Sequence, residues 1–336
     1  MILIDKYKRL RSEAYLKETY DGSYAFVGLG QHSLSNLYPV IHYLQIPLKY
    51  ICVTSEAKAA LIGEKFRGVT ATTDLDAVLS DPEIRGVFVA ASPAAHFSIA
   101  QKVLKAGKAL FVEKPPCSSA EELETLISLN KGIAAAGLQK RYAPAVHLLK
   151  KKLSHEKTIS YDLHYCTGPY PEGNALTDLF IHPLDLVCHL FGPAEILSCR
   201  ATGKDSYLLM LGHGDITGSL ELSTQYSWTD ARETLAVNTG SGLYELDRTE
   251  RLTLRVKPAV IAGIPLEKAG LGKTGTKVLF EQNSFSPVLQ QNQVYTQGFF
   301  DEIRAFAEKT QGRKAEILSD LPSLRDTYRL LYRISV

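Results

Sequence analysis

Lys114 stands where a buried strand is expected to stop. Residues 110–112 are an apolar run, which is typical of a strand inside a sheet. Glu113 and Lys114 follow, and the prolines at 115 and 116 cannot continue a central strand because proline has no N–H to donate. Such a strand would hold its lysine at the carboxyl edge of a sheet, where open α/β sheets bind ligands. Lys114 is therefore a candidate for proton transfer, although a lone lysine in a turn is more commonly a solvated charge.

A second group of chemically active side chains lies between residues 174 and 192. Its polar members recur at helical spacing along one side: Asp178, His182, Asp185 and His189. Its apolar members recur on the opposite side: Phe180, Leu184, Val187 and Phe191. Pro183 predicts a kink or a restart of the helix at His182. Aspartate and histidine in adjacent turns supply the groups of a proton relay, and the alternative is an amphipathic helix with a solvated polar face.

A glycine-rich segment predicts a dinucleotide-binding loop. Residues 24–27 form a short apolar strand that runs into Gly28, Gly30 and Ser33, the spacing of the dinucleotide fingerprint with serine in the third position. Gly28 permits a tight turn, and Gly30 lets the backbone approach a pyrophosphate. A helix is expected to begin near Ser33 and to direct unpaired N–H groups at the phosphates. Ser33 leaves slightly less room than glycine for helix–strand packing.

The end of the next strand bears on the choice of cofactor. NAD-binding units usually carry an acidic residue there, which holds the ribose hydroxyls. After the strand expected at 48–53, this chain has Thr54 and Ser55, with Lys58 one helical turn further on. Hydroxyl groups and a cation suit the extra phosphate of NADP, so we expect NADP rather than NAD. The alternative is that Glu56 turns back and takes the acidic role.

Strand and helix alternate through the first half of the chain, which predicts a doubly wound parallel sheet. A charged stretch at 4–20 is expected to form a helix that packs on the surface of this region. Further strands are expected at 69–72, 86–91 and 109–112, and helices at 57–66, 75–79, about 96–106 and about 118–136. We place the end of this domain at residue 143, with a helical extension at 1–22.

The second half of the chain has a different pattern. Alternation of apolar and polar residues at 159–165 predicts a half-buried strand. Further strands are expected at 194–201, 207–211, 216–226, 233–238 and 243–246, joined by short turns. This succession predicts an antiparallel sheet. A long loop is expected at 261–290, and helices at 293–309 and 321–334.

Composition excludes several classes of protein. The 336 residues are too many for one ordinary core, which favours two domains. A net charge of +2 gives no electrostatic case for nucleic acid or a membrane surface. Neither a membrane-spanning run nor a secretory signal is recognised. Five scattered cysteines without a Cys-x-x-Cys pair are expected to be free thiols in a cytoplasmic protein, not zinc ligands or disulfides.

Together these segments resemble the Gfo/Idh/MocA family of NAD(P)-dependent oxidoreductases, most closely its bacterial virulence-factor-type (MviM-like) subgroup. The likeness covers most of the chain. It is carried by Gly28-Leu29-Gly30, Ser92-Pro93 with His96, Ala106-Gly107-Lys108, Glu113-Lys114-Pro115, Arg141-Tyr142-Ala143-Pro144 and the run from Asp178 through His182 and Asp185 to Gly192. The resemblance implies an α/β protein, with a Rossmann dinucleotide-binding domain at 1–143. An α+β domain with a large open, mainly antiparallel sheet would follow at 144–336.

The resemblance also implies a set of site residues. The catalytic residues would be Lys114, Asp178 and His182. Cofactor-binding residues would be Gly28, Gly30, Gln31, His32, Ser33, Thr54, Ser55, Lys58, Ala91, Ser92, Pro93, His96, Glu113, Lys114 and Arg141. Substrate-binding residues would be Lys114, Arg141, Tyr142, Tyr165, Asp178 and His182. No metal is expected.

The expected reaction transfers a hydride between the nicotinamide of NADP or NAD and a carbinol or carbonyl carbon of a sugar, an inositol or a related polyol. Alternatives are a reductase of an imine or a tetrapyrrole, and a non-catalytic NADP-binding sensor. The second sheet is expected to leave one face uncovered, which predicts a homodimer or homotetramer formed through that face.

Overall fold

The structure, a computed structural model, describes residues 2–14, 19–271, 275–283, 285 and 288–335. The chain divides into two compact units, each assembled from two separate segments. Unit 1 combines Met1–Gly137 with Phe299–Ser323, and unit 2 combines Leu138–Gly298 with Leu324–Val336. This differs from the two continuous domains predicted to meet at residue 143. No described helix is long and apolar enough to cross a membrane.

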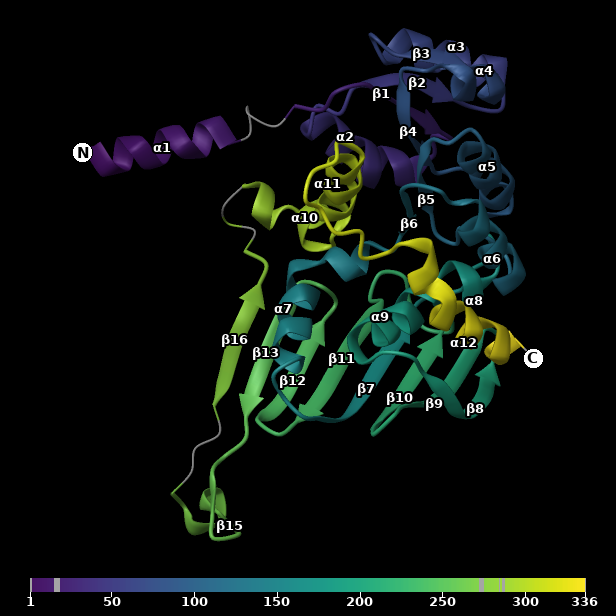
Figure 1. Ribbon diagram of the computed structural model, residues 1–336. Helices are drawn as coiled ribbons and strands as arrows, with labels where there is room; N and C mark the ends of the chain where they lie inside the picture. Colours follow the sequence, from purple (N-terminus) through teal and green to yellow (C-terminus); the bar gives the residue numbers. More distant parts are fainter. Residues whose placement is uncertain (1, 15–18, 272–274, 284, 286–287, 336) are drawn as a thin grey trace. The chain divides into compact units, whose positions relative to one another are not determined.

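Unit 1 is built on a six-stranded sheet in the order β3-β2-β1-β4-β5-β6, with every pairing parallel (Figure 1). Its strands are β1 (Ser23–Val27), β2 (Leu48–Cys52), β3 (Thr70–Thr72), β4 (Ile84–Val89), β5 (Ala109–Glu113) and β6 (Ala134–Gly137). The strand order reverses beside β1, as in a doubly wound sheet. The parallel sheet predicted from the alternation of strand and helix is confirmed.

The helices of unit 1 largely follow the predicted positions. They are α1 (Ile2–Ala14), η1 (Ser33–Leu37), α2 (Tyr38–Tyr43), α3 (Glu56–Lys65), α4 (Leu75–Ser80), α5 (Pro93–Lys105), α6 (Ala120–Leu129) and α11 (Phe299–Thr310). The helix expected over 4–20 ends at Ala14, and residues 15–18 lie outside the described part. Leu3, Ile4, Tyr7 and Leu10 of α1 are exposed, so the predicted packing of this helix is not seen for these four side chains.

The packing of helix α11 explains why Phe299–Ser323 belongs to unit 1 although it is distant in the sequence. Phe306 packs edge-on against Phe88 of β4 and Phe111 of β5, with ring centroids 5.2 and 5.8 Å away. Phe88 and Phe111 are fully buried. The sequence prediction assigned this helix to the second domain because its amphipathic pattern does not show which sheet it covers.

The helix predicted to run from about 118 to 136 is wrong at its end. Ser119 caps α6 as expected, accepting a hydrogen bond from the Glu122 N–H at 3.2 Å, but the helix ends at Leu129. Residues 134–137 form β6, which pairs in parallel with β5. Alanine favours helices, yet these residues form a buried strand. At Gly137 the space is tight, because an added Cβ would lie 2.9 Å from the Glu113 carboxyl group.

Unit 2 contains an eight-stranded sheet in the order β16-β13-β12-β11-β7-β10-β9-β8 (Figure 1). Its strands are β7 (Thr158–Cys166), β8 (Glu195–Gly203), β9 (Ser206–His213), β10 (Ile216–Ser223), β11 (Arg232–Thr239), β12 (Gly242–Asp247), β13 (Arg251–Val256) and β16 (Thr276–Glu281). The pairing of β7 with β10 is parallel, and the other six are antiparallel. The predicted mainly antiparallel sheet is therefore confirmed.

Burial alternates along the central strands of this sheet. On β7, Tyr161 and Leu163 are buried, whereas the side chains before and after them are partly exposed. The covering helices are α7 (Pro144–Leu153), α9 (Ile181–Phe191) and α12 (Arg325–Ser335). On β9, Leu208 and Met210 are 49% and 46% exposed, so this unit has a face that its own helices leave open.

The helix predicted across 174–192 is broken earlier than Pro183. Asn174 caps α8 (Ala175–Asp178), accepting a hydrogen bond from the Leu176 N–H at 2.9 Å. Helix α9 begins at Ile181, so Pro183 lies within its first turn, where a missing N–H leaves no helical bond unmade. Asp178 and His182 therefore belong to different helices.

Two more predictions near the C-terminus need correction. The long loop expected at 261–290 contains the edge strand β16 as well as β15 (Ile264–Pro265) and the end of β14 (Val260–Ile261). The helix expected at 293–309 is divided into α10 (Gln293–Thr296) and α11 by Gly298, whose φ is +97°. The helix expected at 321–334 is η5 (Leu321–Leu324) followed by α12.

Candidate functional site

A pocket of about 530 Å³ lies at the carboxyl ends of β1, β2 and β4 in unit 1. Loops that follow parallel strands meet at this edge, which is where doubly wound sheets bind nucleotides. The pocket is lined by Val27, Gly28, Leu29, Gly30, Cys52, Val53, Thr54, Lys58, Thr73, Leu75, Ala90, Ala91, Ser92, Ala95 and Ile99. Six predicted cofactor residues are among them: Gly28, Gly30, Thr54, Lys58, Ala91 and Ser92.

The two glycines of the loop have different physical roles. Gly28 has a φ of +83°, and a Cβ there would lie 2.6 Å from the Ala90 carbonyl oxygen, so a side chain cannot fit. Gly30 faces open space, with no atom within 4 Å of an added Cβ. This open space beside bare backbone suits a pyrophosphate. Ser33 is buried at the start of η1, so serine fits where the fingerprint usually has glycine.

Of the residues that follow β2, Thr54 and Lys58 line the pocket, whereas Ser55 and Glu56 do not. Lys58 donates from Nζ to the Leu29 carbonyl oxygen at 2.6 Å, which holds its ammonium beside the glycine loop. The Ser55 side chain caps α3 by accepting a hydrogen bond from the Lys58 N–H at 3.3 Å. Glu56 accepts a hydrogen bond from the Thr73 hydroxyl and is not among the pocket residues. The structure therefore turns the carboxylate of Glu56 toward Thr73.

His96 connects two loops at the same edge of the sheet. The side chain is 1% exposed, and its Nδ1 and Nε2 lie 2.8 Å from the Pro115 carbonyl oxygen and 3.1 Å from that of Ala91. Burial lowers the pKa of His96 below its ordinary value, although both carbonyls oppose that shift. Pro93 is the first residue of α5 and starts the helix that carries His96. His96 thus holds the segment after Lys114 against the loop after β4.

Glu113 and Lys114 lie at the end of β5, as the sequence predicted. Glu113 is 5% exposed, and its Oε2 accepts a hydrogen bond from the Lys114 N–H at 3.2 Å. Burial raises the pKa of Glu113, but His32, Lys114 and His96 together outweigh it and leave the pKa below the ordinary value. The His32 Nε2 lies 3.5 Å from Glu113 Oε1. The Lys114–Pro115 peptide bond is cis. Gln31 lies beside His32 in the loop and donates to the Ser35 hydroxyl at 2.9 Å.

Asp178 and His182 are buried in unit 2. Asp178 is 6% exposed and accepts hydrogen bonds from the hydroxyls of Thr177 at 3.0 Å and Tyr170 at 3.3 Å. Burial and the Asp178 charge raise the pKa of Tyr170 to about 12. His182 is 8% exposed and follows one turn into the next helix. The alternative, a solvated polar face, does not hold for these two residues.

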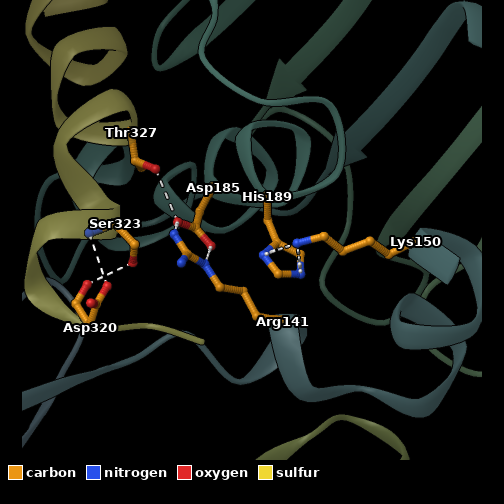
Figure 2. A network of polar contacts seen from close by, with 7 residues as sticks. All are labelled: Arg141, Lys150, Asp185, His189, Asp320, Ser323 and Thr327. Carbon is orange, nitrogen blue, oxygen red and sulfur yellow. Dashed lines mark hydrogen bonds and ion pairs between the residues drawn. The ribbon is translucent and has the colours of Figure 1, made fainter. Parts of the chain in front are cut away.

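Arg141 belongs to a buried ion pair that the sequence did not predict (Figure 2). Its Nε and NH2 groups donate to the two carboxylate oxygens of Asp185 at 2.8 and 2.5 Å. Thr327 of α12 donates its hydroxyl hydrogen to the same carboxylate at 3.0 Å. The Arg141 side chain is 4% exposed, so its guanidinium is committed to joining η2 (Gln139–Tyr142) to α9. The neighbouring Tyr142, predicted to bind substrate, is 3% exposed.

Tyr165 lies on β7, and the Lys140 ammonium stands over its ring, 5.1 Å from the centroid. Burial raises the pKa of Tyr165, with a smaller contribution from Glu233. Lys140 also forms an ion pair with Glu233 of β11. This cluster is within unit 2, as is Asp178.

The sequence did not point to several side chains, or pairings of side chains, that surround the predicted site residues. Tyr170 and Thr73 were not candidates, because neither stands in a motif and each reaches its partner through the fold. The pairing of His32 with Glu113 spans 81 positions (113 − 32) and left no local signal. The hydroxyl of Tyr170, eight residues before Asp178, could have been suspected only from knowing where the intervening turn leads.

Among the described residues, no group of three or more His, Cys, Asp or Glu side chains is arranged to hold a metal ion. The strand order of unit 1 and the glycine-loop pocket at its carboxyl edge define a dinucleotide-binding α/β protein. Residues 23–133 match the profile described as the oxidoreductase family with an NAD-binding Rossmann fold (GFO_IDH_MocA).

Relatives and solved structures extend the likeness. The uncharacterized oxidoreductase YhhX of Escherichia coli is 28% identical over 173 residues, 45% of this chain and 50% of the relative. An inositol 2-dehydrogenase/D-chiro-inositol 3-dehydrogenase of Lactiplantibacillus plantarum is 26% identical over 171 residues, 47% of this chain and 48% of the relative. The matched part thus spans about half the length of these relatives. A dehydrogenase from Chromobacterium violaceum has the same fold, with a TM-score of 0.77 at 20% identity over 94% of this chain and 95% of the other.

Proposed function

We propose that the chain is an NAD(P)-dependent dehydrogenase that acts on a sugar, an inositol or a related polyol. The observation that carries the proposal is the nucleotide pocket with Lys114 at the end of the adjacent strand β5. Relatives named as inositol, D-xylose and UDP-N-acetylglucosamine dehydrogenases support this class of substrate. A levoglucosan dehydrogenase whose structure holds NADH and L-sorbose has a TM-score of 0.77 at 17% identity over 94% of this chain and 96% of the other.

The residues of the pocket fit a dinucleotide. Bare backbone at Gly28 and Gly30 would receive the pyrophosphate, and the carboxyl end of β2 would receive the adenosine ribose. When bound, the nicotinamide supplies hydride chemistry at its C4 atom. The protein's part is to orient the cofactor and the substrate and to move the proton of the reacting oxygen.

Lys114, Asp178 and His182 are the groups proposed for that proton. An ammonium can donate a hydrogen bond to a substrate carbonyl oxygen and accept the proton back as the alcohol is oxidised. We assign Lys114 and His182 to the reacting oxygen, and Asp178 to the orientation of a substrate hydroxyl or of His182. Burial of Asp178 and His182 strengthens any electrostatic contact that they make with a substrate.

We further propose that the chain prefers NADP to NAD. Thr54 and Lys58 line the pocket, whereas Glu56, the alternative acidic group, is not among its lining residues. Loss of the Lys58 ammonium should weaken NADP binding more than NAD binding, because only NADP carries the extra phosphate. A 3-ketoreductase from Actinomadura kijaniata whose structure holds NADP has a TM-score of 0.72 at 14% identity over 94% of this chain and 97% of the other.

Calorimetry on wild type, Lys58→Ala and Lys65→Ala tests the cofactor preference. Lys65, in the last turn of α3, is exposed and is not among the pocket residues, so it is the matched control. We expect wild type and Lys65→Ala to bind NADP more tightly than NAD, and Lys58→Ala to lose about tenfold or more of that preference. Equal affinities in the wild type, or tighter NAD, contradict the preference.

The substrate class is tested by following nicotinamide absorbance with panels of sugars, inositols and nucleotide sugars in both directions. Turnover of at least one polyol is expected. Turnover confined to imines or tetrapyrroles would replace the polyol with the alternative substrate class.

We also propose that a second copy of the chain covers the open face of the unit 2 sheet, giving a homodimer or a homotetramer. Exposed Leu208 and Met210 would gain burial there. All five cysteines are free, and we infer a cytoplasmic location from the reduced thiols.

A further inference from the structure

The glycine loop of unit 1 is held in its middle by a side chain from another element. Lys58 of α3 donates from Nζ to the Leu29 carbonyl oxygen at 2.6 Å. Leu29 stands between Gly28 and Gly30, and its own side chain is buried. Leu29 and Lys58 both line the nucleotide pocket. A cation in the wall of the pocket is therefore bonded to the backbone of the loop that is proposed to receive the pyrophosphate.

Backbone hydrogen bonds hold the loop on either side of this contact. The Gly28 N–H donates to the Cys52 carbonyl oxygen at 2.8 Å, and the Gly30 carbonyl oxygen accepts the Leu34 N–H at 3.0 Å. The peptide unit that joins Leu29 to Gly30 lies between these two bonds. Side-chain packing cannot orient this unit at Gly30, because an added Cβ there meets no atom within 4 Å.

The bond from Lys58 supplies that orientation. The peptide bond between Leu29 and Gly30 is trans. In a planar trans peptide the carbonyl group and the N–H group point in opposite directions. By holding the Leu29 carbonyl, Lys58 therefore also sets the direction of the Gly30 N–H. An ammonium has three N–H donors, so two remain for a ligand while the third holds the loop.

We propose that Lys58 is a positioning residue for the glycine loop, which holds the peptide unit between Leu29 and Gly30 in the orientation that receives the pyrophosphate of either nucleotide. This role is separate from the preference for NADP, in which the same ammonium contacts the extra phosphate. The inference rests on the proposed function, because it requires the loop to bind a dinucleotide. It predicts that loss of Lys58 weakens the binding of NADH, which has no extra phosphate, as well as that of NADPH.

The test compares NADH with adenosine, which has no phosphate, by fluorescence titration and competition. Lys58→Met keeps the length of the side chain without its donor, and Lys58→Arg keeps a cationic donor. Lys65→Met, at an exposed position on α3, is the matched control. Lys58→Met should bind NADH about three- to tenfold more weakly than wild type, the usual worth of one hydrogen bond, and bind adenosine as wild type does. Lys58→Arg and Lys65→Met should bind NADH as wild type does.

Hydrogen exchange of the nucleotide-free proteins separates loop positioning from direct attraction between Lys58 and the pyrophosphate. The amides of residues 28–34 should exchange faster in Lys58→Met than in wild type, Lys58→Arg or Lys65→Met, because the middle of the loop is no longer held. The amides of β1 should exchange at the same rate in all four proteins, which shows that the sheet is intact.

Unchanged NADH affinity in Lys58→Met overturns the positioning role and leaves the proposed function standing. An equal loss of adenosine affinity does the same, since it would assign Lys58 to the ribose. Loop exchange that stays at the wild-type rate, or faster exchange that extends into β1, also overturns it. A wild type that binds neither NADH nor NADPH refutes the proposed function and the positioning role together.

Discussion

At the residue scale, Lys114 owes its position to the strand before it and to His96 behind the loop that follows. The carbonyl of Pro115 is held at 2.8 Å by a histidine that is 1% exposed. A lysine anchored on both sides loses little entropy when it engages a substrate, which is what positioning a catalytic group requires.

Replacing Lys114 with alanine should lower turnover by about 10²-fold or more, the usual contribution of a general acid–base group. Nucleotide affinity should stay within a few fold, because the proposed phosphate contacts lie at Gly28 and Gly30. Lys114→Arg should not restore turnover, since a guanidinium does not release its proton near neutral pH. Steady-state kinetics and calorimetry measure the two effects, with the exposed Lys105 as the alanine control. Wild-type turnover in Lys114→Ala would remove Lys114 from the chemistry.

His189 lies against the Lys150 ammonium in unit 2 (Figure 2), and this contact predicts that unit 2 is sensitive to acid. Burial, and then the charge of Lys150, whose Nζ lies 3.3 Å from both ring nitrogens, lower the pKa of His189 from 6.5 to about 3. Above pH 6.5 the ring is neutral in both folded and unfolded chains, so it has no effect on stability. As the pH falls below 6.5, the unfolded chain takes up a proton that the folded chain refuses, and stability decreases.

Urea midpoints should therefore fall between pH 7 and 5 more steeply for wild type than for His189→Gln. The difference between them should reach about 1 kcal/mol at pH 5. His155→Gln, at an exposed histidine, should follow wild type. Parallel curves for all three proteins would contradict the assignment.

Local spacing was sufficient to place Gly28, Gly30 and Lys114 after the ends of strands, and Lys58 in the first turn of the helix that follows β2, because these strands have sequence signatures of their own. The network of Arg141 with Asp185 and Thr327 was beyond such reasoning. Its members are 44 and 142 residues apart, and the family resemblance suggested a ligand-binding role for Arg141. Which carboxylate faces a buried cation depends on how helices pack, and the spacing of residues within one helix does not encode it.

At the element scale, β6 shows how packing overrides propensity. Three alanines favour a helix by themselves, but this segment completes the parallel sheet beside β5. Gly137 pairs with Glu113 across the two strands, and the space above it is filled by the Glu113 carboxyl group. At this position the Glu113 carboxyl group on β5 leaves no room for a side chain on β6.

Gly137→Ala should destabilise the protein by about 1–3 kcal/mol, because the new methyl group must displace a buried carboxylate. Gly132→Ala is the matched control, since an added Cβ there meets no atom within 4 Å. Chemical denaturation of both variants checks the prediction. An unchanged Gly137→Ala would mean that Glu113 moves without cost.

At the scale of the whole molecule, both sheets could be predicted. Alternation of strand and helix indicates the Rossmann sheet, alternation of apolar and polar residues indicates the larger one, and both patterns can be read within short segments of the sequence. The division of the chain was not, since α11 and α12 have similar amphipathic patterns and cover different sheets. Phe306 packs against Phe88 and Phe111, and the periodicity of apolar residues does not predict which rings come into contact.

Light scattering at micromolar concentration should report twice or four times the mass of one chain. Met210→Glu, on the open face of the unit 2 sheet, should shift the population toward monomer, because it places a charge in the proposed apolar contact. Leu61→Glu, at an exposed position on α3, should leave the assembly intact. A monomeric wild type would refute the proposed assembly.

The return of Phe299–Ser323 to unit 1 also sets an order of events during synthesis. A ribosome delivers β1 to β6 first, but Phe88 and Phe111 must wait for Phe306 to cover them. Making the intervening residues 138–298 takes roughly 10 to 30 s at ordinary elongation rates. Unit 2 is likewise incomplete until Leu324–Val336 has been made. Neither unit of the nascent chain can therefore be completed before the residues after 298 have been made, and until then the aromatic surface of the first lacks the cover that Phe306 gives it.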